Sequence, residues 1–503
     1  MNLLRYSLVT LLLTTFSLAV PAQERFSGDR ECGVTDRDPW LDKYQDGLID
    51  PTEKSLNTLF VPARFIVLGD NDGNGYIDPL KLLNSFALLN SDYAEMNIQF
   101  YIHSIDYVNR TIYWDHASFS TGQTMMIQNN VAGVINNYIV ENPAGSCGYY
   151  SPGLADAMAM GRNCMGSIDR TWSHEMGHYL SLPHTFVGWE GMDIDDQDFN
   201  VPAPTMVGSR IVELADTTNC LDAADRFCDT GPDYLSNRWG CNAAGMYRDS
   251  LLDPDSTRFA VGGYNIMSYA LDNCVGGFSD EQRTAMQTRM ATRGLADDSG
   301  IGAVAANGAE MNLLLPEDNA TLIVNDFVEL VWNSVPNADY YLVQLNSSTN
   351  FNGNVLQSII TTDTTFIIEE GLQSRTNYFW KVRPFNKYVI DSDFGEQLFR
   401  FRNGRFTTST IDAALNAAIS VVPNPISAGR ELLIAGRDLG ESGQLTYELI
   451  DAAGRVLFSR ENLTVGGAGF TERIATDKLT AGIYFLRLRL NDKLVTKRVV
   501  VTP

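Results

Sequence analysis

The chain has 503 residues, of which 44% are hydrophobic and 19% are charged. It is too long for one compact core and too apolar to be disordered, so we expect several domains. The formal net charge of −24 argues against nucleic acid or an anionic membrane surface as the main partner, because their phosphate groups would repel it.

The N-terminus has the pattern of an export signal. A largely apolar run at residues 8–20 precedes Pro21 and Ala22, and small residues of this kind precede signal-peptidase cuts. We expect residues 1–22 to form a signal peptide that is cut after Ala22. No later stretch reaches the roughly 18 apolar residues of a membrane span, so we expect no transmembrane segment and a soluble protein outside the cytoplasm.

Residues 23–58 are polar and show little periodicity, which fits a short propeptide better than a core-forming segment. A mixed α/β domain is expected at residues 59–300. The hydrophobic pattern predicts the following elements in chain order: a strand at 61–68, an amphipathic helix at 79–93, strands at 96–107 and 131–140, a helix at 172–182 after a Gly-, Ser- and Asn-rich loop, and a helix from Ser279.

From about residue 305 the sequence changes to short alternating strands with turn residues between them, which is typical of β sandwiches. A second block of this kind begins at Val421, and neither block has a helical pattern. The fold class is therefore an α/β (α+β) domain followed by two all-β sandwich domains, at residues 305–408 and 415–503. Strands of the first sandwich are expected at residues 327–332, 340–345, 365–369, 377–383 and 399–407.

Three histidines lie within eleven residues. His174 and His178 stand at positions i and i+4 of the predicted helix, so both rings reach the same face, with Glu175 beside them. His184 follows six residues later, beyond a turn that lets the chain fold back. Three imidazoles at this spacing predict a zinc site, and the alternative is an accidental cluster of surface or core histidines.

Three protein ligands leave the fourth position of a zinc ion open for water, whose pKa falls toward about 7 on the metal. Glu175 would then act as the general base that takes the proton of this water and passes it to a leaving amine. This combination predicts hydrolysis of peptide bonds.

The motif from His174 to His184, together with residues 264–269 (YNIMSY), resembles the zinc helix and Met-turn of the metzincins, and specifically of the pappalysin family of secreted endopeptidases. The resemblance covers roughly residues 28–296. It implies that Met267 forms a hydrophobic floor under the histidines and that Tyr269 stabilises the oxyanion, whereas both could also be ordinary core residues. Ser181 stands where the family has Gly, which normally relieves the backbone at this turn.

An odd number of cysteines in an exported chain leaves at least one thiol unpaired. Cys32, within residues 30–36 (RECGVTD), resembles the cysteine switch of metzincin zymogens. The resemblance implies that its thiolate blocks the zinc until cleavage near Lys54 or Arg64. The alternative is a disulfide partner or a stray thiol.

Six cysteines remain for three disulfides, and the sequence alone leaves their connectivity open. In the resembled family a cysteine placed like Cys274 is bonded to one upstream of the Met-turn, which implies the pair Cys241 and Cys274. Proximity in sequence suggests the other pairs, which are Cys220 with Cys228 and Cys147 with Cys164.

Two acidic segments are candidates for Ca²⁺. Residues 70–78 (DNDGNGYID) have the oxygen spacing of a calcium loop, but Lys81 stands where a bidentate Glu would complete an EF-hand. The alternative is a polar turn between a strand and a helix. Residues 193–198 (DIDDQD) fit either a solvated loop or a calcium site near the catalytic centre.

The two β domains resemble different modules. Residues 305–408 resemble a fibronectin type III domain, and residues 415–503 resemble the C-terminal sorting domain of the type IX secretion system. The second resemblance implies a Gram-negative bacterium of the Bacteroidetes kind and delivery to the cell surface or beyond, whereas the alternative is another adhesive sandwich. The segments that carry these resemblances are residues 330–332, 340–341, Leu372 and 377–383 for the first, and residues 422–425, 451–455, 479–485 and 497–501 for the second.

The sequence thus predicts a secreted zinc endopeptidase, made as a latent zymogen, whose partners are protein or peptide substrates and the secretion machinery. The alternative is an inactive surface adhesin that binds its target through the β domains. An intact Glu175 favours the enzyme, because a binding module needs no general base.

Overall fold

The computed structural model describes residues 38–52, 57–322, 328–351, 355–368, 372–373, 375–403, 413–451, 456–480, 482–491 and 493–502. The predicted signal peptide, Cys32 and Lys54 lie outside these residues. Within them, no helix is long and apolar enough to cross a membrane.

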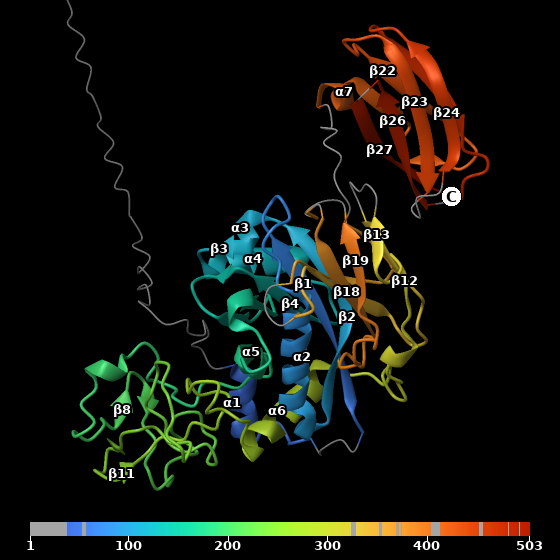
Figure 1. Cartoon of the computed structure of the whole chain (residues 1–503). Coiled ribbons are helices and arrows are strands. Elements are labelled where there is room, and N and C mark those ends of the chain that lie inside the picture. The colour runs from blue at the N-terminus through green and yellow to red at the C-terminus, as the bar shows by residue number, and fades with distance from the viewer. Residues whose placement is uncertain are drawn as a thin grey trace, which may run out of the picture.

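A five-stranded sheet forms the centre of the first domain (Figure 1), in the strand order β2-β1-β4-β7-β6. Its first four strands run parallel, whereas β6 is antiparallel to β7 and occupies the edge. Side chains of β1 alternate between two apolar clusters, one on each face of the sheet. The strands are β1 (Leu59–Gly69), β2 (Ile98–Asn109), β4 (Ile135–Val140), β6 (Gly148–Ser151) and β7 (Ala157–Gly161).

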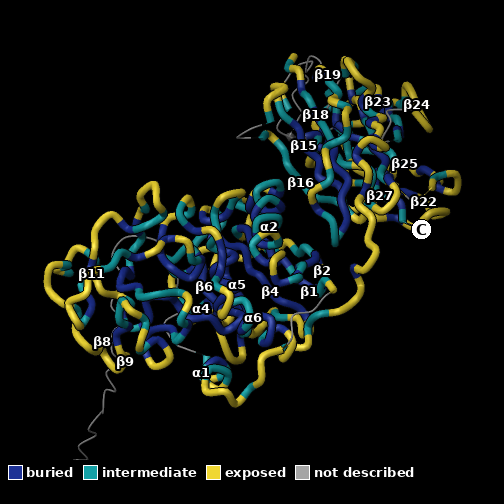
Figure 2. Tube along the Cα trace, turned by 90° about the horizontal axis from the view of Figure 1, so that it is seen from below, coloured by how far each residue is buried: buried dark blue, intermediate teal, exposed yellow. Residues whose placement is uncertain are grey.

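Helices cover both faces of this sheet. Phe65 of β1 packs with Phe86 of α2 (Pro79–Tyr93) and Trp172 of α5 (Thr171–Tyr179) on one face. Met125 and Met126 of α4 (Phe119–Asn129) pack on the other. Both faces of the sheet are therefore shielded from solvent, and its strands are among the most buried parts of the chain (Figure 2). Other elements of this domain are α3 (Thr111–Trp114), β3 (Asp115–His116), β5 (Asn142–Pro143), β8 (Met206–Val207), β9 (Arg210–Ile211), β10 (Leu251–Leu252), β11 (Arg258–Phe259) and α6 (Asp280–Arg293), with 3-10 turns at Ala94–Met96, Arg162–Cys164 and Ile194–Asp196.

Helix ends follow local capping chemistry. The Asp78 side chain accepts a hydrogen bond from the Lys81 amide at the start of α2, and Pro79 follows it. Ser279 and Gln282 form a reciprocal capping box at the start of α6. The predicted starts of both helices are therefore confirmed.

Three expectations about this domain were wrong. The loop expected before the zinc helix contains the strands β6 and β7, which are too short and too rich in Gly and Ala for a clear alternating pattern. The strand expected from Val131 begins only at Ile135. Residues 23–58 were expected to form no core, but their described part contains the helix α1 (Pro39–Gln45), whose Leu41 is fully buried in the core of this domain.

The second domain is a sandwich of a three-stranded sheet, β12-β14-β17, and a five-stranded sheet, β13-β19-β18-β15-β16. Trp332, Trp380 and Tyr378 are buried between the sheets. All five expected strands are present in the described residues, and three short ones were missed. The elements are a 3-10 turn at Gly308–Glu310, β12 (Leu313–Leu315), β13 (Ala320–Leu322), β14 (Val328–Trp332), β15 (Tyr340–Asn346), β16 (Gln357–Thr361), β17 (Thr365–Ile368), β18 (Asn377–Phe385) and β19 (Phe399–Asn403).

The third domain is also a sandwich, of β20-β22-β25 and β21-β27-β26-β23-β24. A short helix, α7, precedes its first strand, contrary to the expectation of strands alone, because a helix of 6 residues is too short to show a helical pattern. The elements are α7 (Ala413–Ala418), β20 (Ile419–Val422), β21 (Ile426–Ser427), β22 (Glu431–Arg437), β23 (Gly443–Asp451), β24 (Val456–Val465), β25 (Gly469–Ala475), β26 (Gly482–Leu490) and β27 (Lys493–Thr502).

The second domain covers the edge strand β2 of the first. The Ile102 amide donates to the Lys387 carbonyl at 2.9 Å, and the Tyr388 ring packs against Phe60 and Tyr101 at centroid distances of 5.8 and 5.1 Å. Phe385 belongs to the same buried cluster as the first domain's core. This contact protects an otherwise open sheet edge.

Tyr388→Ala should therefore destabilise the first domain although the residue belongs to the second. Loss of two aromatic contacts should cost about 1–2 kcal/mol, measured as a lower urea midpoint of the transition reported by near-UV circular dichroism. Leu314→Ala, at an exposed position of the same sandwich, is the control. Equal midpoints for both variants would contradict a stabilising interface.

Candidate metal centre

Three histidine side chains converge on one point beneath the sheet edge. His174 and His178 lie one turn apart on α5, and His184 returns to them after the helix ends. The Nε2 atom of His178 is 3.1 Å from that of His174 and 3.2 Å from that of His184. All three rings are buried. This is the set of residues that the sequence predicted as metal ligands.

The hydrogen bonds at the far side of two rings fix their protonation. Nδ1 of His174 lies 2.7 Å from the Ile266 carbonyl, and Nδ1 of His178 lies 2.7 Å from the Leu182 carbonyl. A carbonyl oxygen only accepts, so Nδ1 carries the proton in each neutral ring and Nε2 carries a lone pair. Two lone pairs that face each other at 3.1 Å repel, and a cation between them removes the conflict.

The surroundings keep the rings of His174 and His178 neutral. Burial, followed by the nearby His184, lowers the pKa of His174 to about 3. The same causes, with His174 as a further contributor, hold the pKa of His178 well below its ordinary value. Neutral imidazole is the form that binds a metal ion, so the donor set fits Zn²⁺.

A left-handed residue directs the chain from the helix to the third histidine. Helix α5 ends at Tyr179, before the expected Leu182, and Ser181 has a φ of +77°. The Leu182 amide donates to the Gly177 carbonyl at 2.9 Å. Ser181 thus adopts the backbone conformation that glycine usually adopts at such a turn. The turn therefore forms with serine in place of glycine.

Met267 lies under the zinc helix. It is fully buried, and a Cβ atom added to Gly177 would lie 2.4 Å from its Sδ atom. The Met267 amide donates to the Asn265 side chain at 2.8 Å, and its carbonyl accepts from the Thr185 amide at 3.3 Å. The Met267 segment is therefore fixed to the residue that follows the third histidine.

Asp233 is a site residue that sequence reasoning missed. Its Oδ2 atom accepts from the Thr185 hydroxyl at 2.7 Å and from the Ser268 hydroxyl at 3.0 Å. Burial raises the pKa of Asp233 to about 6, against the opposing effect of these hydrogen bonds. The residue links the segment of His184 to the segment of Met267, and nothing in its local sequence signals this role.

Glu175 and Tyr269 line a small cavity together with His174, Arg238 and Asp272. The Tyr269 ring lies 5.0 Å from the His184 ring, measured between centroids. Glu175 is fully buried and adjoins the edge strand, because a Cβ atom on Gly148 would lie 3.0 Å from its Cγ. The residues expected to be catalytic are thus next to the histidines.

Three disulfides stabilise the loops around this centre, and they are the three pairs expected from the sequence. Cys147–Cys164 joins the segments before β6 and after β7. The other two cross-link the long loop region between α5 and α6. These are Cys220–Cys228 and Cys241–Cys274.

The expectation of bound Ca²⁺ is not supported. Asp70 accepts hydrogen bonds from the amides of Asp72 and Asn74, which lower its pKa and close a polar turn. Asp193 likewise accepts from the Asp195 amide. Among the described residues, three side chains close enough together to hold a metal ion are found at the histidine cluster and not at either acidic segment.

Gly177→Ala should disturb the metal centre although alanine favours a helix. The new methyl group would displace Met267, so we expect a loss of about 1–3 kcal/mol of stability and a lower zinc content after dialysis. Gly262→Ala, where a Cβ atom meets nothing within 4 Å, is the control. A more stable Gly177→Ala protein with full zinc content would contradict this packing.

Glu213 should make stability depend on pH. It is buried, and neither carboxylate oxygen has a hydrogen-bond partner among the described residues. Burial, followed by Asp233, raises its pKa to about 8. The folded state then binds a proton that the unfolded state has lost, so stability should fall as pH rises from about 5 to 8.

Glu213→Gln should remove the part of the stability loss between about pH 5 and 8 that Glu213 causes. Thermal midpoints across this pH range measure the effect. Asp222→Asn, at an exposed carboxylate nearby, is the control and should keep it. Parallel pH profiles for wild type and Glu213→Gln would contradict the raised pKa.

Residues 420–502 match the family described as a secretion system C-terminal sorting domain. Over 254 residues, 46% of this chain and 75% of the relative, the sequence is 25% identical to an extracellular metalloprotease of Colletotrichum graminicola. It is 26% identical over 256 residues to one of Pyricularia oryzae, which covers 47% of this chain and 76% of the relative. Among solved structures, the FN1–FN3 domains of chicken CNTN1 are 11% identical with a TM-score of 0.19, over 40% of this chain and 69% of that one.

The histidine cluster and the metalloprotease relatives together support a metalloprotease whose metal ion is zinc. The C-terminal match supports export by the corresponding secretion machinery, and a protease implies peptide substrates.

Proposed function

We propose that the protein is a secreted zinc endopeptidase of the metzincin type, similar to the pappalysins. The observation that carries this proposal is the convergence of three buried imidazoles on one point, with Glu175 buried beside them. A bound Zn²⁺ would polarise the scissile carbonyl and acidify a water molecule.

Glu175 would hold and move the proton. It follows His174 directly on α5 and lines the same cavity, so its carboxylate can take the proton of an attacking water and give it to the leaving amine. Tyr269 would donate from its hydroxyl to the oxyanion, because its ring packs against two of the histidine rings.

The edge strand β6 would bind the substrate backbone. In the described sheet, β6 pairs with β7 on one side only, and Gly148 places it against Glu175. An extended peptide can add to such an edge through main-chain hydrogen bonds. A side chain at Gly148 would press on Glu175 and Met160, so glycine lets this strand lie directly against the general base.

Latency would depend on Cys32, whose thiolate suits the open position of zinc. Cleavage at Arg64 is incompatible with the fold, because Arg64 lies inside β1 and is paired with Asp106. Cleavage near Lys54 therefore remains the proposal. The sorting domain would deliver the enzyme through the type IX system to the surface of a Bacteroidetes cell or beyond it.

The proposal predicts that Glu175→Gln keeps zinc but loses peptidase activity by several orders of magnitude, because only the general base is removed. His178→Ala should lose both zinc and activity. Metal analysis and a casein zymogram with and without chelator measure the two effects.

Activity in Glu175→Gln would overturn the mechanism. Absence of activity from an intact, zinc-loaded and propeptide-free wild type would favour the alternative, a binding protein that acts through its β domains.

A further inference from the structure

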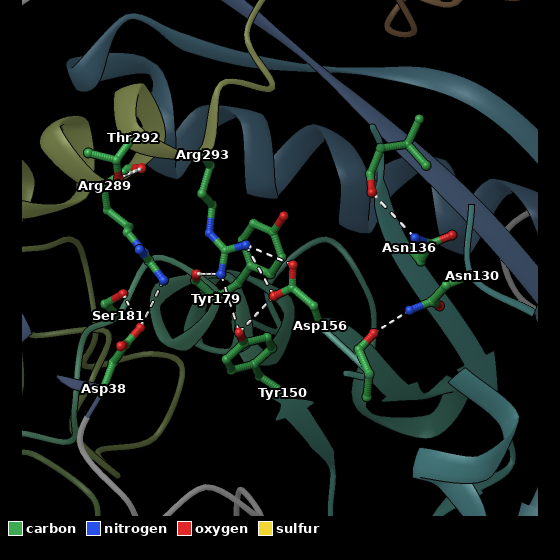
Figure 3. A network of polar contacts seen from close by, with 12 residues as sticks. Asp38, Asn130, Asn136, Tyr150, Asp156, Tyr179, Ser181, Arg289, Thr292 and Arg293 are labelled. Atoms are coloured by element: carbon green, nitrogen blue, oxygen red, sulfur yellow. Dashed lines mark hydrogen bonds and ion pairs between the residues drawn. The ribbon is translucent and has the colours of Figure 1, made fainter. Parts of the chain in front are cut away.

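The carboxylate of Asp38 is held by two residues of the catalytic domain (Figure 3). Its Oδ2 atom accepts from the Ser181 hydroxyl at 2.6 Å and from Arg289 at 3.1 Å. Its Oδ1 atom accepts from the Trp40 amide and caps helix α1. Asp38 therefore fixes the start of α1 and attaches it to the zinc-binding turn and to α6.

Ser181 is built for this contact. Its side chain is buried, and its backbone is left-handed, where glycine would fit without strain. A left-handed backbone conformation at a serine lowers the stability of the folded protein. A hydrogen bond from the buried hydroxyl to a good acceptor offsets this loss. Asp38 supplies that acceptor.

Arg289 also finds its partners in the N-terminal segment. In the described structure its ion-pair partner is Asp38, and the Trp40 ring lies 5.0 Å from its guanidinium carbon. The neighbouring Arg293 instead bonds Asp156 and Tyr150 within the catalytic domain. Arg289 thus depends on the N-terminal segment for its partners, whereas Arg293 does not.

Both groups face a cavity of about 400 Å³ beside the zinc helix. Asp38 and Pro39 enter it from the N-terminal segment. The other lining residues are Tyr150, Pro152, Gly153, Asp156, His178, Ser181, Leu182, Arg289 and Arg293. Arg293 in this lining is already paired with Asp156, so Arg289 and the Ser181 hydroxyl are the groups that bind the Asp38 carboxylate.

Further contacts hold the rest of the segment. The side chain of Gln45 donates to the carbonyls of Asp225 and Arg226. Arg226 pairs with Asp46 at 2.7 Å. The Thr52 amide donates to the Thr288 hydroxyl on α6 at 3.0 Å. The segment is thus attached at both of its ends and along its helix.

We propose that Ser181 and Arg289 form a carboxylate-binding site whose ligand is Asp38, and that residues 38–52 stay bound to the catalytic domain after the chain is cut between residues 53 and 56. This binding does not depend on Cys32. The proposal goes beyond the proposed latency, because residues 38–52 act as a ligand of the catalytic domain in their own right. Their release is then a step distinct from cleavage of the chain.

The test uses the full-length chain with Cys32→Ala, to remove any thiolate contact, and Glu175→Gln, to prevent self-cleavage. A recognition sequence for a specific protease is inserted between Glu53 and Leu56, and the protein is cut there. Size-exclusion chromatography at a series of dilutions then measures the fraction of N-terminal fragment that stays with the remainder.

We expect the fragment to co-elute at micromolar concentration. Asp38→Asn should weaken retention at least tenfold, because asparagine still caps α1 but loses the charge that Arg289 binds. Ser181→Gly should weaken it less, since glycine keeps the turn. Asp50→Asn, at an exposed carboxylate of the same segment, should have no effect.

Separation of the fragment from the parent protein at these concentrations would overturn the proposal. Equal retention in the Asp38→Asn and Asp50→Asn proteins would overturn the role of the carboxylate site. Because binding is measured in an inactive protein, neither outcome depends on peptidase activity.

Discussion

Lone-pair repulsion between buried imidazoles is the constraint on which the centre depends. The Nε2 atoms of His174 and His178 lie 3.1 Å apart, and carbonyl groups hold both protons on the opposite nitrogens. Burial makes protonation costly, so the rings cannot relieve the conflict by taking up a proton. A metal ion resolves it, which makes the rigid protein around the rings a pre-organised metal site.

The surrounding residues maintain that rigidity from three directions. Met267 contacts the zinc helix from below, where Gly177 has no side chain to oppose it. Asp233 joins the segments that carry His184 and Met267. Ser181 turns the chain between the second and third histidines and binds Asp38. A change at any of these positions acts on the metal centre through the position of a histidine ring.

The chain also shows how accessory segments become part of a catalytic domain. The sandwich of the second domain covers the open edge of β2 through a backbone hydrogen bond and the Tyr388 ring. At the opposite edge, β6 is left for a substrate in the proposed function. The N-terminal segment adds Leu41 to the core. Accessory segments thus contribute both to one edge of the sheet and to the core beside it.

The sequence by itself determined the candidate metal ligands, because two histidines one helical turn apart share a face and a third lies within reach. It also determined α2 and α6, whose apolar periodicity and caps are local signals, and the two β blocks. Proximity and resemblance were enough for the three disulfide pairs. Tertiary structure alone decided the remainder. The neighbouring strands β6 and β7 are too short for a clear alternating pattern. Asp233 joins Thr185 and Ser268, which are distant from it in sequence, and α1 is held by the burial of Leu41 and by contacts with Ser181, Arg289 and Arg226. Such features carry no periodic pattern, because their stability comes from groups that the fold brings together.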